Sequence, residues 1–382
     1  MVRRLYHFLV FFLLISASLL YIPISASASG FTFNKSAAAY SPDSNITQDG
    51  YVHLSGSPFG LAYDQDNGNI YAAVKSANQV SVITNKAISA TVKSIITPIN
   101  VFFDPSNGYV YASLLFPNKV SVISRTNTIE ENISVGNGPM CMGLDNSTGN
   151  LYVTDSCSGN VSVISETNHV IATVKVGNYP NGIAYDSNNG ELYVANRDSG
   201  SYAVIEGSNN LELTTVNVSS ISNETSLPQR IVYDPQNQMF YFANNGSRYV
   251  LEYSPQNESV VKAISIGTFD APCALLYVPS LKEIFLANAA NDKIIIISSQ
   301  NNSMIGSISV GREPSGLAYD PGNRYLYVSI SCSDEIEIFS IANASQKIGI
   351  STSSLSEYYE LGGVAVVVLL GAVVISMKRK KI

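Results

Sequence analysis

The sequence predicts an all-β fold, a seven-bladed β-propeller with four-stranded antiparallel blades, plus an N-terminal signal peptide and one C-terminal transmembrane helix. Three observations predict the propeller. A unit of about forty residues recurs seven times, which is the period of propeller blades. Each unit holds four short apolar runs, and one additional run near the N-terminus supplies the strand that the last unit lacks.

The repeat is marked by a proline followed six residues later by an aspartate. Pro58 and Asp64 mark the first unit, and Pro314 and Asp320 mark the last. The aspartate positions, with Val278 standing in for the sixth, are 64, 104, 145, 186, 234, 278 and 320, so the spacing runs from 40 to 48 residues. Seven such units predict seven blades.

Within a unit, the apolar runs have strand character. In the third unit they are residues 142–145, 151–154, 161–164 and 170–176. The alternation of apolar and polar residues in 161–163 is the two-residue period of a strand with one buried face. Turn segments such as 145–149 begin with Asp, which caps the turn, and end with Gly, which supplies positive φ. Four antiparallel strands per unit make a propeller blade.

The chain ends predict how the ring closes. The last unit has three clear strands and runs into residues 342–346 without a fourth. Residues 51–54 precede the first unit, in the place of a fourth strand. We therefore expect 51–54 to be the outer strand of the last blade within a propeller of residues 47–345, because this pairing leaves no mismatched edge.

The second strand of several units carries a recognisable motif: Leu-Tyr-Val-Thr at 151–154, Leu-Tyr-Val-Ala-Asn at 192–196 and Leu-Tyr-Val-Ser at 326–329. The repeat resembles the YVTN β-propeller repeat of archaeal and bacterial surface-layer-type proteins. The resemblance covers about residues 50–345 and implies the propeller fold. The fifth and sixth units depart from the motif at 240–244 and 284–288, so their blades are expected to be less regular.

Both chain ends read as targeting segments. Arg3 and Arg4, an apolar stretch at 9–20 and a small-residue site at 26–28 predict a signal peptide over 1–28, followed by a lead-in at 29–46. Near the other end, a linker at 346–360 leads into the uncharged run 361–377, which predicts a transmembrane helix. Four basic residues follow, so the tail 378–382 is expected in the cytoplasm and the propeller outside the cell membrane.

Charge and sequons favour an extracytoplasmic body. The net charge is −7; without the six basic residues of the two ends, 16 Lys and Arg face 29 Asp and Glu, a balance near −13 that argues against nucleic-acid binding. Asn-x-Ser/Thr sequons are abundant, which suggests a glycoprotein. The candidate sites are Asn34, Asn45, Asn132, Asn146, Asn160, Asn217, Asn223, Asn245, Asn257, Asn301 and Asn343.

The sequence predicts no catalytic, cofactor or metal site. Outside the leader there are two histidines, His53 in the closing strand and His169 in a hairpin turn, too few and too peripheral for a histidine-based metal site. Residues 64–68 look like the start of a calcium loop, but Lys75 stands where the twelfth-position Glu would be needed. No phosphate-binding loop, nucleophile elbow or zinc-protease motif is present.

The four cysteines are disulfide candidates. Cys141 and Cys273 lie near the start of the first strand of their units, and Cys157 and Cys332 occupy one equivalent slot five residues after a tyrosine. We expect all four on one face, with pairs Cys141–Cys157 and Cys273–Cys332. Free buried thiols are the alternative. A zinc site built from all four is disfavoured, because the third blade and the last two lie across the ring.

These features favour a membrane-anchored surface protein that binds or scaffolds a protein, glycan or other envelope component, through the face that carries the loops between blades. Loops on a rigid disc make a broad recognition surface. The alternative is an extracytoplasmic propeller hydrolase or lactonase, which would need carboxylates at the mouth of the channel; Asp270 is one of few candidates. The fold alone does not decide between them.

Overall fold

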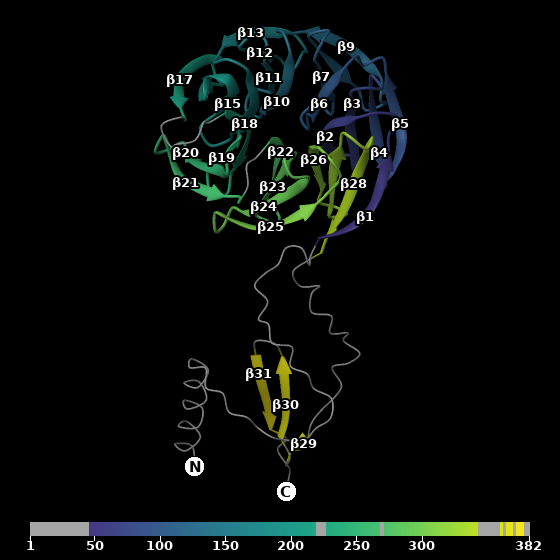
Figure 1. Ribbon diagram of the computed structural model, residues 1–382, viewed down its shortest axis with the longest axis vertical. Helices are drawn as coiled ribbons and strands as arrows, with labels where there is room; N and C mark the ends of the chain where they lie inside the picture. The colour runs from purple at the N-terminus through teal and green to yellow at the C-terminus, as the bar shows by residue number, and fades with distance from the viewer. Residues whose placement is uncertain are drawn as a thin grey trace. The chain divides into compact units, whose positions relative to one another are not determined.

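The computed structural model describes residues 46–218, 227–267 and 271–342, together with the backbone of three short strands between 360 and 377. Residues 46–342 contain seven four-stranded antiparallel sheets. Figure 1 shows these sheets arranged around a common centre as the blades of a propeller. The predicted number of blades and strands per blade is therefore confirmed.

Six blades use four consecutive strands each, counted from the centre outward. The first three blades contain β2 (Pro58–Asp64), β3 (Asn69–Val74), β4 (Gln79–Thr84) and β5 (Ala87–Lys93); β6 (Pro98–Phe103), β7 (Val110–Leu114), β8 (Lys119–Ile123) and β9 (Ile129–Ser134); and β10 (Pro139–Asp145), β11 (Asn150–Asp155), β12 (Asn160–Ile164) and β13 (Val170–Lys175). The next three contain β14 (Pro180–Asp186), β15 (Glu191–Asn196), β16 (Ser201–Glu206) and β17 (Leu211–Asn217); β18 (Leu227–Asp234), β19 (Met239–Asn245), β20 (Tyr249–Ser254) and β21 (Ser259–Ser265); and β22 (Pro272–Val278), β23 (Glu283–Asn288), β24 (Lys293–Ser298) and β25 (Ser303–Ser309).

The seventh blade is built from both ends of the propeller sequence. It contains β26 (Pro314–Asp320), β27 (Tyr325–Ile330), β28 (Glu335–Ile341) and, as its outer strand, β1 (Ile46–His53). Tyr51 lies opposite Glu337 and Val52 opposite Ile336 in the antiparallel pair of β1 and β28. The predicted closing strand is confirmed, and it begins earlier than expected, at Ile46.

The apolar core lies between neighbouring blades rather than inside any one of them. The first strands of adjacent blades approach closely: a Cβ added to Gly316 would lie 2.0 Å from the carbonyl oxygen of Phe59. The tyrosine before the repeat aspartate packs at the same boundary, as Tyr63 does between the seventh and first blades. Each blade thus buries its two faces only against its neighbours.

In four of the blades, the tyrosine of the second strand links the blade to the next one. Tyr71 is buried, and its Oη donates a hydrogen bond of 2.9 Å to Oδ1 of Asn127, in the outer turn of the following blade. The same bond recurs from Tyr111 to Asn168, Tyr152 to Asn210 and Tyr241 to Asn302. These asparagines all have positive φ, a backbone conformation that Asn tolerates better than most residues. One side chain therefore shapes the turn and receives the buried hydroxyl.

The departure of the sixth unit from the motif follows from ring closure. Phe285 takes the tyrosine position there and is fully buried. The following blade pairs β28 with β1, the two ends of the propeller, so no turn connects these strands and no turn asparagine exists to receive a hydroxyl. Ile46 packs into the same cluster as Phe285 instead. A phenylalanine avoids burying an unpaired hydroxyl at this position.

The predicted transmembrane helix is not seen as a helix. Residues 360–377 form β29 (Glu360–Leu361), β30 (Val364–Leu369) and β31 (Ala372–Met377), paired antiparallel. The segment is rich in valine, whose β-branched side chain favours extended backbone. Within the described part of the chain, no helix has the length and apolarity required to cross a bilayer. The predicted signal peptide and basic tail lie outside the described residues.

The tyrosine links predict that two opposite substitutions both destabilise the fold. Tyr111→Phe removes a buried hydroxyl that has a partner, so the free energy of unfolding should fall by about 1 kcal/mol. Phe285→Tyr adds a buried hydroxyl where the ring offers no turn asparagine, so it should also destabilise, by about 1–3 kcal/mol. Urea unfolding of both variants measures these changes. A neutral Tyr111→Phe together with a stabilising Phe285→Tyr would contradict the account.

Candidate functional site

The propeller presents two faces. One side carries the loops that join consecutive blades and the loops between the second and third strands of each blade; we call this side the loop face. These two sets adjoin: Leu115 N donates to Thr97 O at 3.1 Å, and Ser156 N donates to Gly138 O at 2.9 Å. We call turn face the opposite side, which carries the aspartate turns and the outer hairpin turns.

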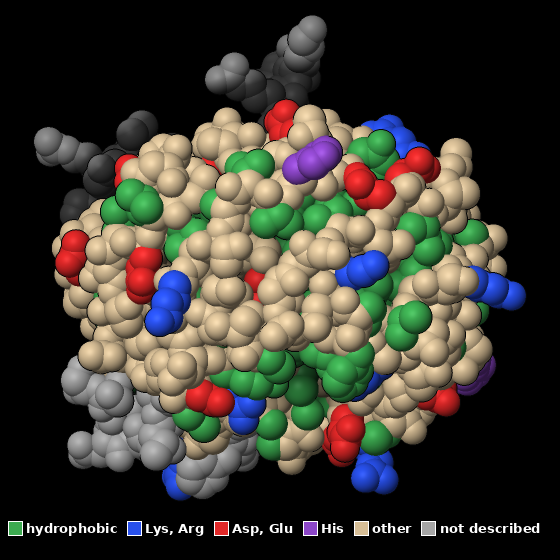
Figure 2. Space-filling model, turned by 90° about the horizontal axis from the view of Figure 1, so that it is seen from above, with side chains coloured by type: hydrophobic (Ala, Val, Ile, Leu, Met, Phe, Trp, Pro, Cys, Tyr) green, Lys and Arg blue, Asp and Glu red, His purple; other side chains and the backbone are tan. Residues whose placement is uncertain are grey.

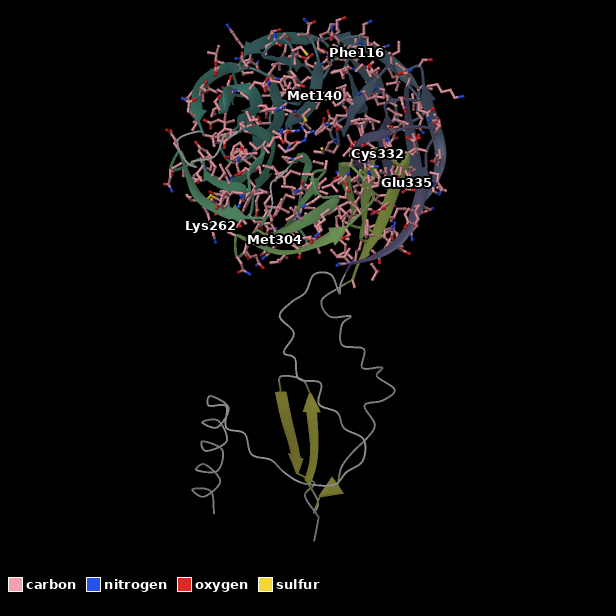
Figure 3. All side chains as sticks on the ribbon, viewed as in Figure 1. Phe116, Met140, Lys262, Met304, Cys332 and Glu335 are labelled. Atoms are coloured by element: carbon pink, nitrogen blue, oxygen red, sulfur yellow. The ribbon has the colours of Figure 1, made fainter. Side chains whose placement is uncertain are left out.

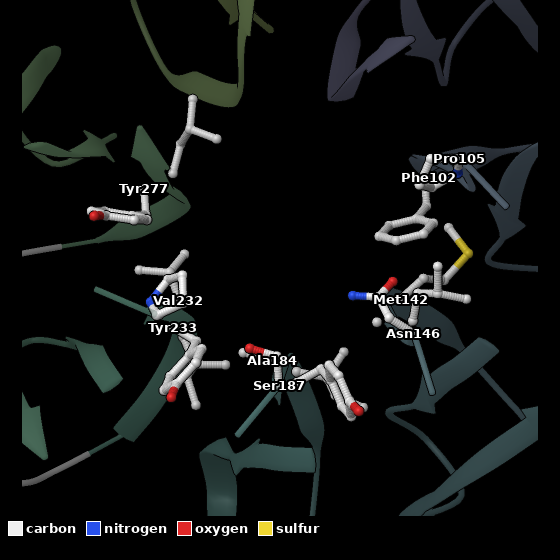
Figure 4. Close-up of a pocket in the computed structure, with 16 residues that line it drawn as sticks. Phe102, Pro105, Met142, Asn146, Ala184, Ser187, Val232, Tyr233 and Tyr277 are labelled. Atoms are coloured by element: carbon white, nitrogen blue, oxygen red, sulfur yellow. The ribbon is translucent and has the colours of Figure 1, made fainter. Parts of the chain in front are cut away.

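A cavity of about 480 Å³ opens at the ring centre on the turn face, lined by residues of five first strands and the turns that follow them. Its lining is mostly apolar and aromatic: Phe102, Met142, Ile183, Ile231 and Leu276 contribute, and Figure 4 shows side chains from several strands around an open centre. The volume lies in the range of small-molecule pockets.

Buried tyrosines stand around this cavity. Burial raises the pKa of Tyr233, the carboxylate of the nearby Asp186 raises it further, and Tyr233 Oη accepts a hydrogen bond from Nδ2 of Asn188. Burial likewise raises the pKa of Tyr277, whose hydroxyl has no hydrogen-bond partner among the described residues. Phenols whose pKa is raised in this way stay protonated, so they offer little acid–base chemistry to a ligand.

The repeat aspartates belong to the turns, as predicted. Each is buried and holds its turn from within; Asp104 Oδ1, for example, accepts a hydrogen bond from Ser106 N at 2.8 Å. The same bond occurs at Asp64, Asp145, Asp186, Asp234 and Asp320. Their role is to shape the hairpins.

At the ring centre on the loop face, a guanidinium connects four blades. Arg230, on β18 of the fifth blade, donates from Nε to the carbonyl oxygen of Cys273 in the sixth blade at 2.6 Å. Its Nη1 donates to Oδ1 of Asn181 in the fourth blade and lies 3.5 Å from Sγ of Cys141 in the third. Asn181 is only 2% exposed, so it holds Arg230 from a fixed position.

Two large apolar side chains are exposed elsewhere on the loop face. Phe116, labelled in Figure 3, is 74% exposed, and Ile96 is 54% exposed. They belong to adjoining loops, which are hydrogen-bonded through Leu115 N and Thr97 O. Both side chains therefore stay in contact with water in this fold.

Asp155 has the most clearly perturbed carboxylate on this face, and its role is structural. Burial raises its pKa to about 6, although its Oδ2 accepts from Ser162 Oγ at 2.7 Å. Ser162 Oγ in turn accepts from Gly136 N at 3.2 Å, and in the seventh blade Glu337 accepts directly from Gly311 N at 3.0 Å. Through Ser162 in one case and directly in the other, a carboxylate holds the first glycine of a loop that joins two blades.

None of the four cysteines forms a disulfide, so the predicted pairs Cys141–Cys157 and Cys273–Cys332 are not present. Cys141 lies on the first strand of its blade, with Sγ against Arg230, whereas Cys157 is exposed in the loop after the second strand, beside Gly138. Cys332 is exposed in the equivalent loop, and its thiol bonds to Glu313, which raises its pKa. The alternative of free thiols is therefore what the structure shows, half-buried or exposed rather than fully buried.

The histidines lie at the rim. His53 Nδ1 is 3.4 Å from the carboxylate of Glu335 on the outer pair of the seventh blade, and His169 is exposed in an outer turn, with Nδ1 2.6 Å from the carbonyl oxygen of Thr167. Among residues 46–218, 227–267 and 271–342, no group of three or more His, Cys, Asp or Glu side chains could hold a metal ion. Asp270 lies outside the described residues.

The sequon asparagines differ in exposure. The exposed ones are Asn132, Asn146, Asn217, Asn257 and Asn301; Asn160 and Asn245 are half-buried; Asn34, Asn45, Asn223 and Asn343 lie outside the described residues. In the edge view of Figure 2, charged side chains are scattered singly over a largely neutral surface, and Lys and Arg do not gather on this side.

Fold and loops define the chain as a seven-bladed β-propeller, and comparison with solved structures agrees. A streptogramin B lyase matches with a TM-score of 0.68 at 14% identity, over 79% of this chain and 100% of the lyase. Virginiamycin B lyase from Staphylococcus aureus matches at 0.65 and 16%, over 77% and 99%, and Kuenenia stuttgartiensis hydrazine synthase at 0.65 and 13%, over 82% and 99%. The chain matches no protein-family model and no curated protein. Likeness at these identities shows the fold alone.

The sequence analysis missed Arg230. One signal in the sequence could have identified it. When the seven first strands are aligned on their prolines, Arg230 is the one Lys or Arg that they contain. What could not be read from the sequence is that its side chain reaches back to Asn181 and Cys141, one and two blades away.

Asp155 predicts a specific pH dependence of stability. Its folded-state pKa of about 6 exceeds the ordinary 3.8, so the native state binds more protons between these values, and this residue's contribution to stability falls as pH rises. Asp155→Asn removes the titration and keeps an acceptor for Ser162 Oγ; asparagine is native at the equivalent Asn196 and Asn288.

At each pH, the unfolding free energy of Asp155→Asn is compared with that of wild type. The variant's advantage should be larger above pH 6 than below pH 4, by at most about 3 kcal/mol. Urea unfolding across this range measures it, and the exposed Glu166→Gln should follow wild type. A difference between variant and wild type that is independent of pH would show that Asp155 is not buried as a titrating group.

Proposed function

We propose that the chain is a membrane-anchored cell-surface β-propeller whose loop face binds a protein partner. The observation that carries the proposal is the exposure of Phe116 and Ile96 on adjoining loops. Aromatic and aliphatic side chains that a fold leaves in water are the anchors around which protein interfaces form. The rigid ring behind these loops would limit the conformational entropy lost on binding.

The anchor is the second part of the proposal. It is supported by the leader at 1–28, the 17 uncharged residues at 361–377 and the basic residues that follow them. The likeness of the repeat to YVTN-type surface proteins also supports an extracytoplasmic location. In a bilayer, residues 361–377 would be helical, because hydrocarbon offers no partners for the backbone groups of open strand edges.

The alternative, a propeller hydrolase or lactonase, has less support. Three of the similar structures are lyases, and one of them is a catalytically inactive histidine-to-alanine variant of virginiamycin B lyase with quinupristin, so a histidine matters for activity in that protein. In this chain His53 and His169 lie at the rim, away from the ring centre. Binding is therefore the function we propose.

One experiment tests both parts. Membranes from cells that express the full chain are washed with alkaline carbonate, crosslinked, and the chain is recovered with its neighbours for mass spectrometry. The chain should stay with the membranes and should capture a protein. Phe116→Ser and Ile96→Ser should reduce capture about tenfold or more, since a buried anchor side chain is worth about 2 kcal/mol.

The matched control is Leu211→Ser, which removes a 59% exposed side chain from an outer strand and should leave capture unchanged. Release of the chain by carbonate would refute the anchor. Equal capture by wild type and both loop variants would refute the loop face as the binding surface, and recovery of glycan alone would refute a protein partner.

A further inference from the structure

We propose that Arg230 is the centre of a binding site for a carboxylate group, where the first strands meet on the loop face. The guanidinium is half-buried and spans four blades, from Cys141 in the third to Cys273 in the sixth. The inference concerns the same face as the proposed function but does not depend on a protein partner, so each can fail without the other.

Among the described residues, no carboxylate matches the charge of Arg230. Its hydrogen-bond acceptors are neutral: the carbonyl oxygens of Cys273 and Gln229, Oδ1 of Asn181 and Sγ of Cys141. None of the ion pairs formed in the described ranges 46–218, 227–267 and 271–342 includes Arg230. A guanidinium partly withdrawn from water without a counter-ion loses solvation and gains no Coulomb attraction, so an anion that reaches it is stabilised.

The geometry leaves one part of the guanidinium available. Nε and Nη1 donate to protein acceptors, which fixes the orientation of the plane, and Nη2 makes no hydrogen bond to a described residue. Nη2 carries two N–H groups, and a charge-assisted hydrogen bond from such a group to a carboxylate oxygen is among the stronger protein contacts.

The surroundings favour a ligand with a single negative charge. The third position of the other six first strands is small or neutral, namely Gly60, Asn100, Cys141, Gly182, Ala274 and Gly316. The single positive charge of Arg230, among neutral neighbours, balances one negative charge on a ligand. The excess of Asp and Glu in the propeller disfavours a ligand with more than one negative charge, such as phosphate. The structure therefore assigns this site to a monocarboxylate, either a small free acid or the C-terminal carboxylate of a peptide.

Ligand-observed NMR on the full chain tests the assignment with three probes: acetate, N-acetyl-diglycine, and the C-terminal amide of N-acetyl-diglycine. Saturable binding is expected for acetate or the peptide acid and not for the amide. Binding of acetate identifies a small-acid site, and binding of the peptide acid alone identifies a site for a chain terminus.

Arg230→Gln should weaken the binding about tenfold or more, as loss of a charged hydrogen bond does. Arg230→Lys keeps the charge and should fall between the variant and wild type, which separates loss of the site from loss of folding. Arg312→Gln, an exposed arginine of a loop that joins two blades, is the matched control and should change nothing. No saturable binding of either acid, unchanged binding in Arg230→Gln, or tighter binding of inorganic phosphate than of acetate would overturn the proposal.

Discussion

The structure depends on the pairing of β1 with β28, which joins residues almost a whole propeller apart in sequence, with Ile46 opposite Ile341. A four-stranded blade with apolar side chains on both faces cannot bury itself, and each blade relies on a neighbour at each side. An open row of seven blades would leave two apolar faces in water. Because β1 completes the last blade, the seventh blade meets the first, where Tyr63, Ile70 and Tyr327 share one core cluster.

The recurring features of the fold were predictable because they are local or periodic. The aspartate turns, the four strands of each unit and the closing strand at 51–54 all follow from the spacing of the repeat. The role of the motif tyrosine was not predictable, because its partner asparagine lies 56 residues away for Tyr71 and 57 for Tyr111. Phe285 occupies the tyrosine position in the sixth blade, and the blade after it has two chain ends where the others have an outer turn. Ring closure therefore explains the phenylalanine.

The disulfide prediction was wrong because it depended on side-chain direction. The loops that join blades and the loops after second strands share a face, which suggested that Cys141 could reach Cys157, but Cys141 Sγ points to Arg230. The membrane anchor is a separate case. The apolar run 361–377 is compatible with a helix in hydrocarbon, and its many valines are also compatible with strands such as β30 and β31. Hydropathy alone does not distinguish a helix from strands. Arg230 breaks the repeat pattern, and its contacts depend on which blades are neighbours.

The two ends of the ring centre differ in chemistry. On the turn face the cavity is apolar, and its tyrosine rings pack where blades meet. On the loop face lie Arg230, which pairs with no carboxylate of a described residue, and the exposed side chains of Phe116 and Ile96. Both proposals therefore concern the loop face.

Hydrogen exchange of the full chain, followed by mass spectrometry, tests the closing pair most directly. Peptides from β1 should be protected to the same degree as peptides from β5 (Ala87–Lys93), an outer strand held by ordinary chain connectivity, because both strands complete a four-stranded sheet. Exchange of residues 46–53 at the rate of an unpaired segment, with β5 protected, would show that the ring is not closed in this way.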